Sequence, residues 1–178
     1  MMVPKTVKAM VTTGHGDFAK LVWHEDWPVP SAGPGDVLVR VGACGLNNTD
    51  INTRTGWYSK AVSEAPTGGA YDEVGNDDPS WGGAAITFPR IQGADICGEI
   101  IAVGEGIDTA RIGERVITDN WLRAPAAPLD KARAGYYGAE RDGGFAEYAT
   151  MPARIALAVS SQLADAELAT FSCSYSTA

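Results

Sequence analysis

Short runs in which hydrophobic and polar residues alternate dominate the chain up to about residue 159. The clearest is Asp36–Cys44, where valines occupy every second position, which is the period-two pattern of a β-strand. Turn sequences rich in glycine and proline separate these runs, as at Gly33-Pro34-Gly35. The same reasoning predicts further strands at Lys8–Thr12, Leu21–Trp27, Asp95–Val103, Arg115–Asp119, Gly144–Pro152 and Arg154–Val159.

The spacing changes after Ser161. Leucine, glutamate and phenylalanine then recur at helical intervals, and Asp165 lies near the start, where it favours the helix dipole. We therefore expect a mostly-β fold, a small barrel, followed by a C-terminal helix. In this interpretation residues 1–160 form one domain, and residues 161–178 form an exit helix and the start of a linker.

A long irregular segment interrupts the strand pattern at about residues 54–90. It contains several glycines and prolines, and a loop of this length in a small domain is usually functional or disordered. Its aromatic residues could line the mouth of a pocket for an apolar or ring-shaped substrate, or could anchor the loop to the barrel. Both interpretations stay open for Trp57, Tyr58, Tyr71 and Trp81.

Charge and composition limit the classes of partner that the protein is expected to bind. The chain has 14 Lys and Arg against 22 Asp and Glu, a net charge of −8, and phosphate-rich nucleic acids or anionic membranes would repel such a surface. No apolar run approaches the roughly 20 residues that a membrane span needs. Three cysteines at wide spacing form no disulfide framework. We expect a cytoplasmic protein with a small-molecule partner, no nucleic acid and no membrane.

Five short segments occur in a characteristic order: Val39–Asp50, Pro89–Gly104, Gly113–Val116, Gly143–Tyr148 and Cys173–Ala178. Together they resemble the medium-chain dehydrogenase/reductase superfamily, which contains the zinc-type alcohol dehydrogenases and the quinone oxidoreductases. The resemblance implies an N-terminal GroES-like catalytic domain on the substrate side of a cleft. It also implies a following Rossmann domain that binds the nicotinamide cofactor.

This resemblance sets the expectation for cofactors. The dinucleotide fingerprint is missing, because Gly104-Glu105-Gly106 lacks a third glycine and opens no helix. NADP or NAD is therefore expected to be bound mainly by a domain absent from this chain, and the 178-residue chain alone is expected to be inactive. Relatives in this superfamily often dimerise, so a homodimer is the assembly that the resemblance suggests.

The zinc ligands of the superfamily are replaced. Catalytic zinc in these enzymes usually has Cys, His and Cys ligands, and the matching positions here are Asn47, Ala94 and Cys173. An amide is a poor zinc ligand and alanine offers no donor. Asp95 replaces a neighbouring glutamate. No zinc is expected, and an Asn at the first position resembles the zinc-free quinone reductases.

Without a metal, hydrogen-bond donors must stabilise the charge that develops on a substrate oxygen. We predict Asn47 and Thr49 as catalytic residues, Asn47 and Asn48 as cofactor contacts, and Trp57, Tyr58 and Asp95 as substrate-pocket residues. Asn, Thr and Asp clusters also cap helices and satisfy turns, and Asp50 is interpreted in that structural sense.

The sequence therefore predicts a zinc-independent, NAD(P)H-dependent oxidoreductase of the quinone reductase type, which transfers hydride to a carbonyl or an enone. Two alternatives stay open. One is a zinc-dependent alcohol dehydrogenase domain, which needs ligands that the sequence does not supply. The other is a non-catalytic GroES-like binding or assembly module, since a fold does not determine a function.

Overall fold

The structure is a computed structural model that describes residues 3–58, 85–130 and 133–176. Most of its regular structure is β, as predicted. The helices are short: α1 (Asn48–Thr55), α2 (Asp165–Leu168) and α3 (Ser172–Ser176). The strands are β1 (Thr6–Thr12), β2 (Leu21–Pro28), β3 (Asp36–Gly45), β4 (Arg90–Ile91), β5 (Asp95–Val103), β6 (Arg115–Thr118), β7 (Trp121–Leu122), β8 (Gly135–Tyr136), β9 (Tyr148–Pro152) and β10 (Ala156–Ala158).

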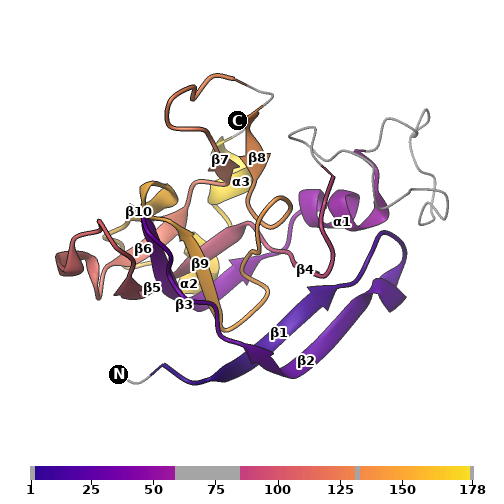
Figure 1. Cartoon of the computed structure of the whole chain (residues 1–178), viewed down its shortest axis with the longest axis horizontal. Helices are drawn as coiled ribbons and strands as arrows, with labels where there is room; N and C mark the ends of the chain where they lie inside the picture. The colour runs from indigo at the N-terminus through magenta and orange to yellow at the C-terminus, as the bar shows by residue number, and fades with distance from the viewer. Residues whose placement is uncertain (1–2, 59–84, 131–132, 177–178) are drawn as a thin grey trace.

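Two antiparallel sheets and one small ribbon contain these strands. The larger sheet has the order β10-β6-β5-β3-β9, the second has the order β2-β1-β4, and β7 pairs with β8. The segment before β9 joins the two sheets, because Phe145 O accepts from Met10 N (2.8 Å) and Glu147 O accepts from Val41 N (2.9 Å). In Figure 1 the β1–β2 hairpin runs below the larger sheet, while β7, β8 and α3 gather above it.

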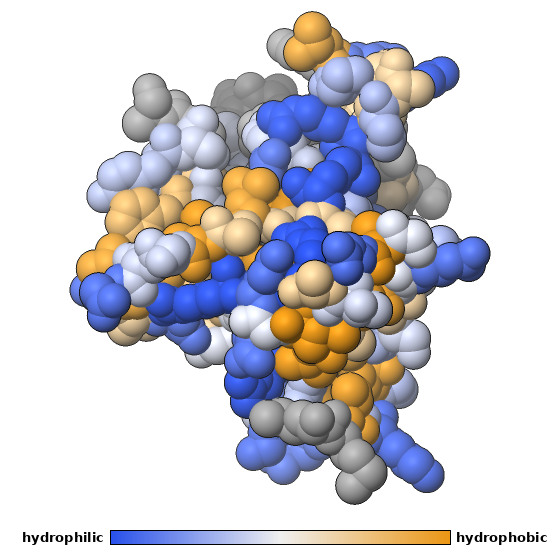
Figure 2. Space-filling model, turned by 90° about the vertical axis from the view of Figure 1, so that its left-hand side faces the viewer, coloured by the Kyte–Doolittle hydropathy of each residue, from blue (hydrophilic) through white to orange (hydrophobic). Residues whose placement is uncertain are grey.

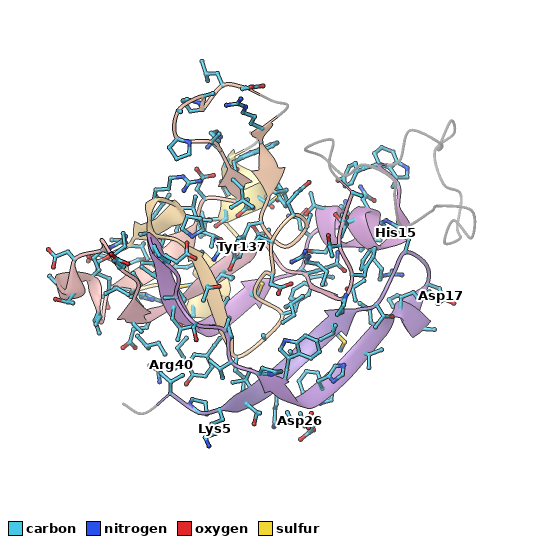
Figure 3. The ribbon with its side chains drawn as sticks, in the orientation of Figure 1. Lys5, His15, Asp17, Asp26, Arg40 and Tyr137 are labelled. Carbon is cyan, nitrogen blue, oxygen red and sulfur yellow. The ribbon has the colours of Figure 1, made fainter. Side chains whose placement is uncertain are left out.

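The main core lies against the larger sheet. Its buried residues come chiefly from β3, β5, β6 and β9, with Tyr137 fully buried among them. Figure 3 shows Tyr137 in the middle of the fold. Its hydroxyl donates to Thr150 O (2.8 Å), so this large aromatic adds apolar packing without leaving a buried polar group unpaired.

Helix α1 was not predicted, because its sequence NTDINTRT contains one large apolar residue and no helical apolar face. Its ends stabilise it instead. Gly56 ends the helix in the left-handed conformation (φ 74°). Arg54 is buried, donates to Gly16 O, and lies 4.8 Å from the centre of the Phe18 ring. Figure 3 shows His15 beside this helix, and its Nδ1 lies 3.0 Å from Thr53 O.

The C-terminal segment also differs from the prediction. We expected one exit helix after Ser161, but the chain forms α2 and α3 with a turn between them. Thr170 Oγ1 bonds to Glu167 O (2.7 Å), and such side-chain bonds compete with a continuing helix. Residues 121–138, where the alternation pattern predicts no strand, contain the short strands β7 and β8.

The predicted irregular segment at 54–90 is described only at its two ends. It includes the end of α1 and the start of β4. Tyr71 and Trp81, which the sequence leaves open as pocket or loop-anchoring residues, lie outside the described residues.

No helix in the described parts of the chain has the length and apolar character of a bilayer span. On the face shown in Figure 2, hydrophobic residues form separate patches divided by hydrophilic ones. Scattered exposed apolar residues of this kind are normal for a protein surface.

Strands β3 and β5 approach closely at Gly98, which pairs with Val41. A Cβ at Gly98 would lie 2.3 Å from Arg40 O. We expect Gly98→Ala to lower the free energy of unfolding by about 1–3 kcal/mol, because the strands must separate. Urea denaturation measures this change. Gly33→Ala is the matched control: its Cβ meets only Asp36 Oδ2, at 3.6 Å. Equal stability of the two variants would contradict the close approach.

Candidate functional site

The candidate site forms where β3 ends and α1 begins. Asn47 is the N-cap residue of α1 and has extended backbone angles (φ −128°, ψ 163°). Its backbone N–H donates to Asp50 Oδ2 (2.9 Å), the reciprocal bond of a capping box. Asp50 Oδ1 accepts from Gly93 N (3.1 Å). Asp50 therefore ties the first turn of α1 to the loop before β5.

Asp50 occupies a buried position, 7% exposed. Burial raises its pKa from the usual 3.8 to about 6, against the lowering effect of the Asn47 and Gly93 N–H groups; the nearby Asp95 raises it further. The Asp50 carbonyl oxygen also accepts from Gln92 Nε2 (2.9 Å), and Thr12 donates to Gln92 Oε1 (2.8 Å). These bonds fix α1 against β1 and the β4–β5 loop.

A second carboxylate, Asp95, is the centre of the site. It is the first residue of β5 and is 3% exposed. Its Oδ1 accepts from Asn120 Nδ2 and from the Cys173 backbone N–H, both at 2.8 Å. Its Oδ2 accepts a longer, weaker bond from Asn47 Nδ2 (3.4 Å). Three segments far apart in the sequence therefore meet on one carboxylate.

The cluster extends from Asn120 to Tyr136. Asn120 Nδ2 also donates to the Tyr136 hydroxyl (3.0 Å). Burial raises the pKa of Tyr136 far above its ordinary value, the Cys173 side chain adds to this rise, and the Thr49 side chain opposes it. Tyr136 is therefore neutral at physiological pH and keeps its proton.

Thr49 Oγ1 is buried and makes no hydrogen bond in the part of the chain that is described. The Thr49 side chain lowers the pKa of Tyr136 through a hydrogen-bonding interaction, so the two hydroxyl groups are neighbours, although they do not meet the geometry of an ordinary hydrogen bond. A buried hydroxyl without a partner is unusual in a folded protein, and it is available to a ligand.

The structure brings some of the predicted site residues together. Asn47 and Asp95 are hydrogen-bonded, and Thr49 borders the same cluster through Tyr136. Asn48 is exposed at the start of α1. Their roles in catalysis and cofactor binding stay predictions.

Trp57 and Tyr58 lie past the opposite end of α1, about 12 Å along its axis. Their rings meet edge to face at 5.7 Å, and Asn52 Nδ2 donates to the Tyr58 hydroxyl (3.4 Å). No bond joins them to Asp95 among the residues that the structure describes, so their place in a substrate pocket stays a prediction.

Two members of the cluster, Asn120 and Tyr136, were not predicted. Asn120 is the second residue after the end of β6, and a polar residue near a strand end is a weak signal of a site. Tyr136 belongs to β8, a two-residue strand that is too short to leave an alternation pattern in the sequence. Folding brings Asn120 against Asp95 and Tyr136 against Asn120, and these contacts between distant segments are not visible in the sequence.

The donor set does not fit a catalytic zinc ion. Ala94 is 1% exposed and packs with Cys173 in an apolar cluster. Asn47 contributes an amide, and both oxygens of Asp95 already accept N–H donors. Zinc requires thiolate, imidazole or carboxylate ligands, and of the three matching positions Cys173 alone has a side chain of this kind. Across the described ranges, no three His, Cys, Asp or Glu side chains converge on a metal position.

Comparisons with known proteins agree with one another. The sequence model of the family described as "Alcohol dehydrogenase GroES-like domain" matches residues 33–161. An L-threonine 3-dehydrogenase of Streptomyces avermitilis is 29% identical over 140 residues, which are 74% of this chain and 34% of that protein. An NAD-dependent alcohol dehydrogenase of Sulfolobus acidocaldarius is 26% identical over 153 residues, 82% of this chain and 38% of that protein.

Solved structures give the same fold. A protein of Sinorhizobium meliloti 1021, provisionally described as an alcohol dehydrogenase, is 46% identical with a TM-score of 0.79, covering 97% of this chain and 45% of that one. Acetophenone reductase from Geotrichum candidum, in complex with NAD, shares the fold at 21% identity and a TM-score of 0.68, with the same coverage. The predicted GroES-like fold is confirmed. The chain spans about a third of the length of the curated relatives.

The raised pKa of Asp50 predicts a pH dependence of stability. The folded state binds the proton more tightly than the unfolded state, so this contribution is fully present below pH 3.8 and is lost as pH rises through about 6. Between pH 4 and 7, we expect the wild type to lose on the order of 2 kcal/mol of unfolding free energy relative to Asp50→Asn. Urea denaturation across this range measures the difference, and a constant difference would contradict the assignment.

Proposed function

Because the chain belongs to the alcohol dehydrogenase GroES-like domain family, we propose that it forms the substrate side of an oxidoreductase that transfers hydride between NAD or NADP and a carbonyl or enone carbon. The observation that carries this proposal is the amide of Asn47, held by the buried Asp95 where β3 meets α1. The curated relatives are named as NAD-dependent alcohol dehydrogenase and L-threonine 3-dehydrogenase. These names support a reaction that interconverts a carbonyl compound and an alcohol.

The proposed role of Asn47 is to donate a hydrogen bond to the reacting oxygen. The bound nicotinamide supplies the hydride, and negative charge then develops on the substrate oxygen, where a pre-positioned donor is most effective. A side-chain amide nitrogen carries two hydrogens. Asn47 can therefore donate one to Asp95 Oδ2 and the other to the substrate, while Asp95 limits the rotation of the amide.

Thr49 is proposed to exchange the proton with the substrate oxygen. Its hydroxyl is buried and unbonded among the described residues, so it can donate to an alkoxide and accept from an alcohol. Asn52 follows one helical turn later and donates to the Tyr58 hydroxyl. Its side chain is an amide, so it offers no imidazole that could pass the proton further. The resemblance to zinc-dependent relatives implies a relay histidine at the position of Asn52, so the proton route beyond Thr49 differs here.

We further propose that the reaction is zinc-independent and of the quinone reductase type. Asn47 occupies the first ligand position, and the segment Gly93–Gly98 resembles the zinc-free branch. The lack of suitable zinc ligands beside Cys173, at Asn47 and Ala94, supports the same conclusion. The names of the relatives favour a second candidate, a zinc-type alcohol dehydrogenase domain, and the ligands present make it the weaker one.

The test is Asn47→Ala in the complete protein. Loss of the donor removes stabilisation of the charged oxygen, and we expect kcat/KM to fall about 10²–10³-fold with a smaller change in cofactor affinity. Steady-state kinetics of NAD(P)H oxidation measure it. Ile51→Ala is the control on the same helix, since Ile51 is 42% exposed. Equal kinetics of wild type and Asn47→Ala would remove Asn47 from the mechanism.

A further inference from the structure

Asn120 is a buried amide with an unusual pattern of bonds. It is 2% exposed, and its Nδ2 donates to both Asp95 Oδ1 (2.8 Å) and the Tyr136 hydroxyl (3.0 Å). These two bonds use both hydrogens of the nitrogen. A flipped amide would turn its carbonyl oxygen toward the Asp95 carboxylate, so the orientation of the side chain is determined.

The carbonyl oxygen of the same side chain has no partner. Asn120 Oδ1 is buried and accepts no hydrogen bond in the described parts of the chain. Buried acceptors are almost always paired, and this one cannot turn away without breaking the bonds to Asp95 and Tyr136. The site therefore presents a fixed acceptor that requires a donor from outside the described chain.

This acceptor belongs to the cluster that contains Asn47. The two amides bind the two oxygens of one carboxylate, Asp95. The Nδ2 atoms of Asn120 and Asn47 therefore lie on either side of one carboxylate group. Thr49 Oγ1, the second unbonded oxygen of the cluster, borders Tyr136 together with Asn120.

We propose that Asn120 is a specificity-determining residue, whose Oδ1 accepts a hydrogen bond from a hydroxyl group on the carbon next to the reacting carbonyl. The preferred substrates are then α-hydroxy ketones, or vicinal diols in the reverse direction. This inference rests on the proposed function, because it takes the reacting oxygen to lie at Asn47. A plain quinone carries acceptors only and would leave Asn120 Oδ1 unpaired, so within the proposed zinc-free, quinone reductase type of reaction this residue favours hydroxy ketones over plain quinones.

The test compares three ketones that differ in one group. α-Hydroxyacetophenone carries the donor, propiophenone replaces the hydroxyl by a methyl, and α-methoxyacetophenone keeps the oxygen without its hydrogen. Their affinities for the wild-type protein are measured by ligand-observed NMR without cofactor. We expect the hydroxy ketone to bind about ten-fold more tightly than the other two, because an unpaired buried acceptor opposes their binding.

Two variants test whether the preference for the hydroxy ketone depends on Asn120. Asn120→Leu has a similar volume and no acceptor, and it should bring the three affinities within about two-fold of one another. Ser172→Ala is the matched control: it also removes a buried unbonded oxygen, Ser172 Oγ, from a surface groove beside Phe171, and it should keep the preference. Equal affinities in the wild type, or no binding of the hydroxy ketone, would overturn the inference even if Asn120→Leu does not fold.

Turnover separates this inference from the proposed function. NAD(P)H oxidation by the complete protein is measured with the same three ketones. A preference in binding without turnover of any ketone would contradict the proposed hydride transfer and leave the role of Asn120 supported. Turnover of all three ketones with equal kcat/KM and equal affinity would support the hydride transfer and overturn the role of Asn120.

Discussion

The rest of the site depends on the burial of the Asp95 carboxylate. A buried charge is tolerated only when hydrogen bonds replace its hydration, and here Asn120, Cys173 and Asn47 supply N–H donors. Each donor comes from a different segment, so satisfying one carboxylate brings together the end of β6, the start of α3 and the β3–α1 junction. The same residues that stabilise the charge become the polar groups of the candidate cleft.

The second buried carboxylate, Asp50, has a different role. It accepts backbone N–H groups on both sides and holds the first turn of α1, so it positions Asn47 without offering a free oxygen. Figure 1 shows α1 away from the larger sheet, where these bonds and the buried Arg54 are its main attachments. One carboxylate thus fixes the helix and the other organises the side chains around it.

Local patterns explain which parts were predictable from the sequence. Strand β5 begins and ends as predicted, and β3 differs by one residue, because apolar runs rich in Val and Ile between glycine-rich turns are a local signal of a strand. Asn47 and Asp95 were identified by family resemblance. Helix α1 was missed because its stability comes from caps and from Arg54 rather than from an apolar face. Asn120 and Tyr136 join the site only through contacts between distant segments, which leave no local signal.

We propose that amide and backbone donors around Asp95 take the place of a metal ion. The zinc content of the protein, purified from zinc-supplemented cells without chelators and measured by mass spectrometry of the metal, tests this proposal. We expect well below one zinc per chain, both in the wild type and in Cys173→Ser. One zinc per chain that is lost in Cys173→Ser would contradict it, because Cys173 would then be a ligand and the bonds at Asp95 would have to rearrange.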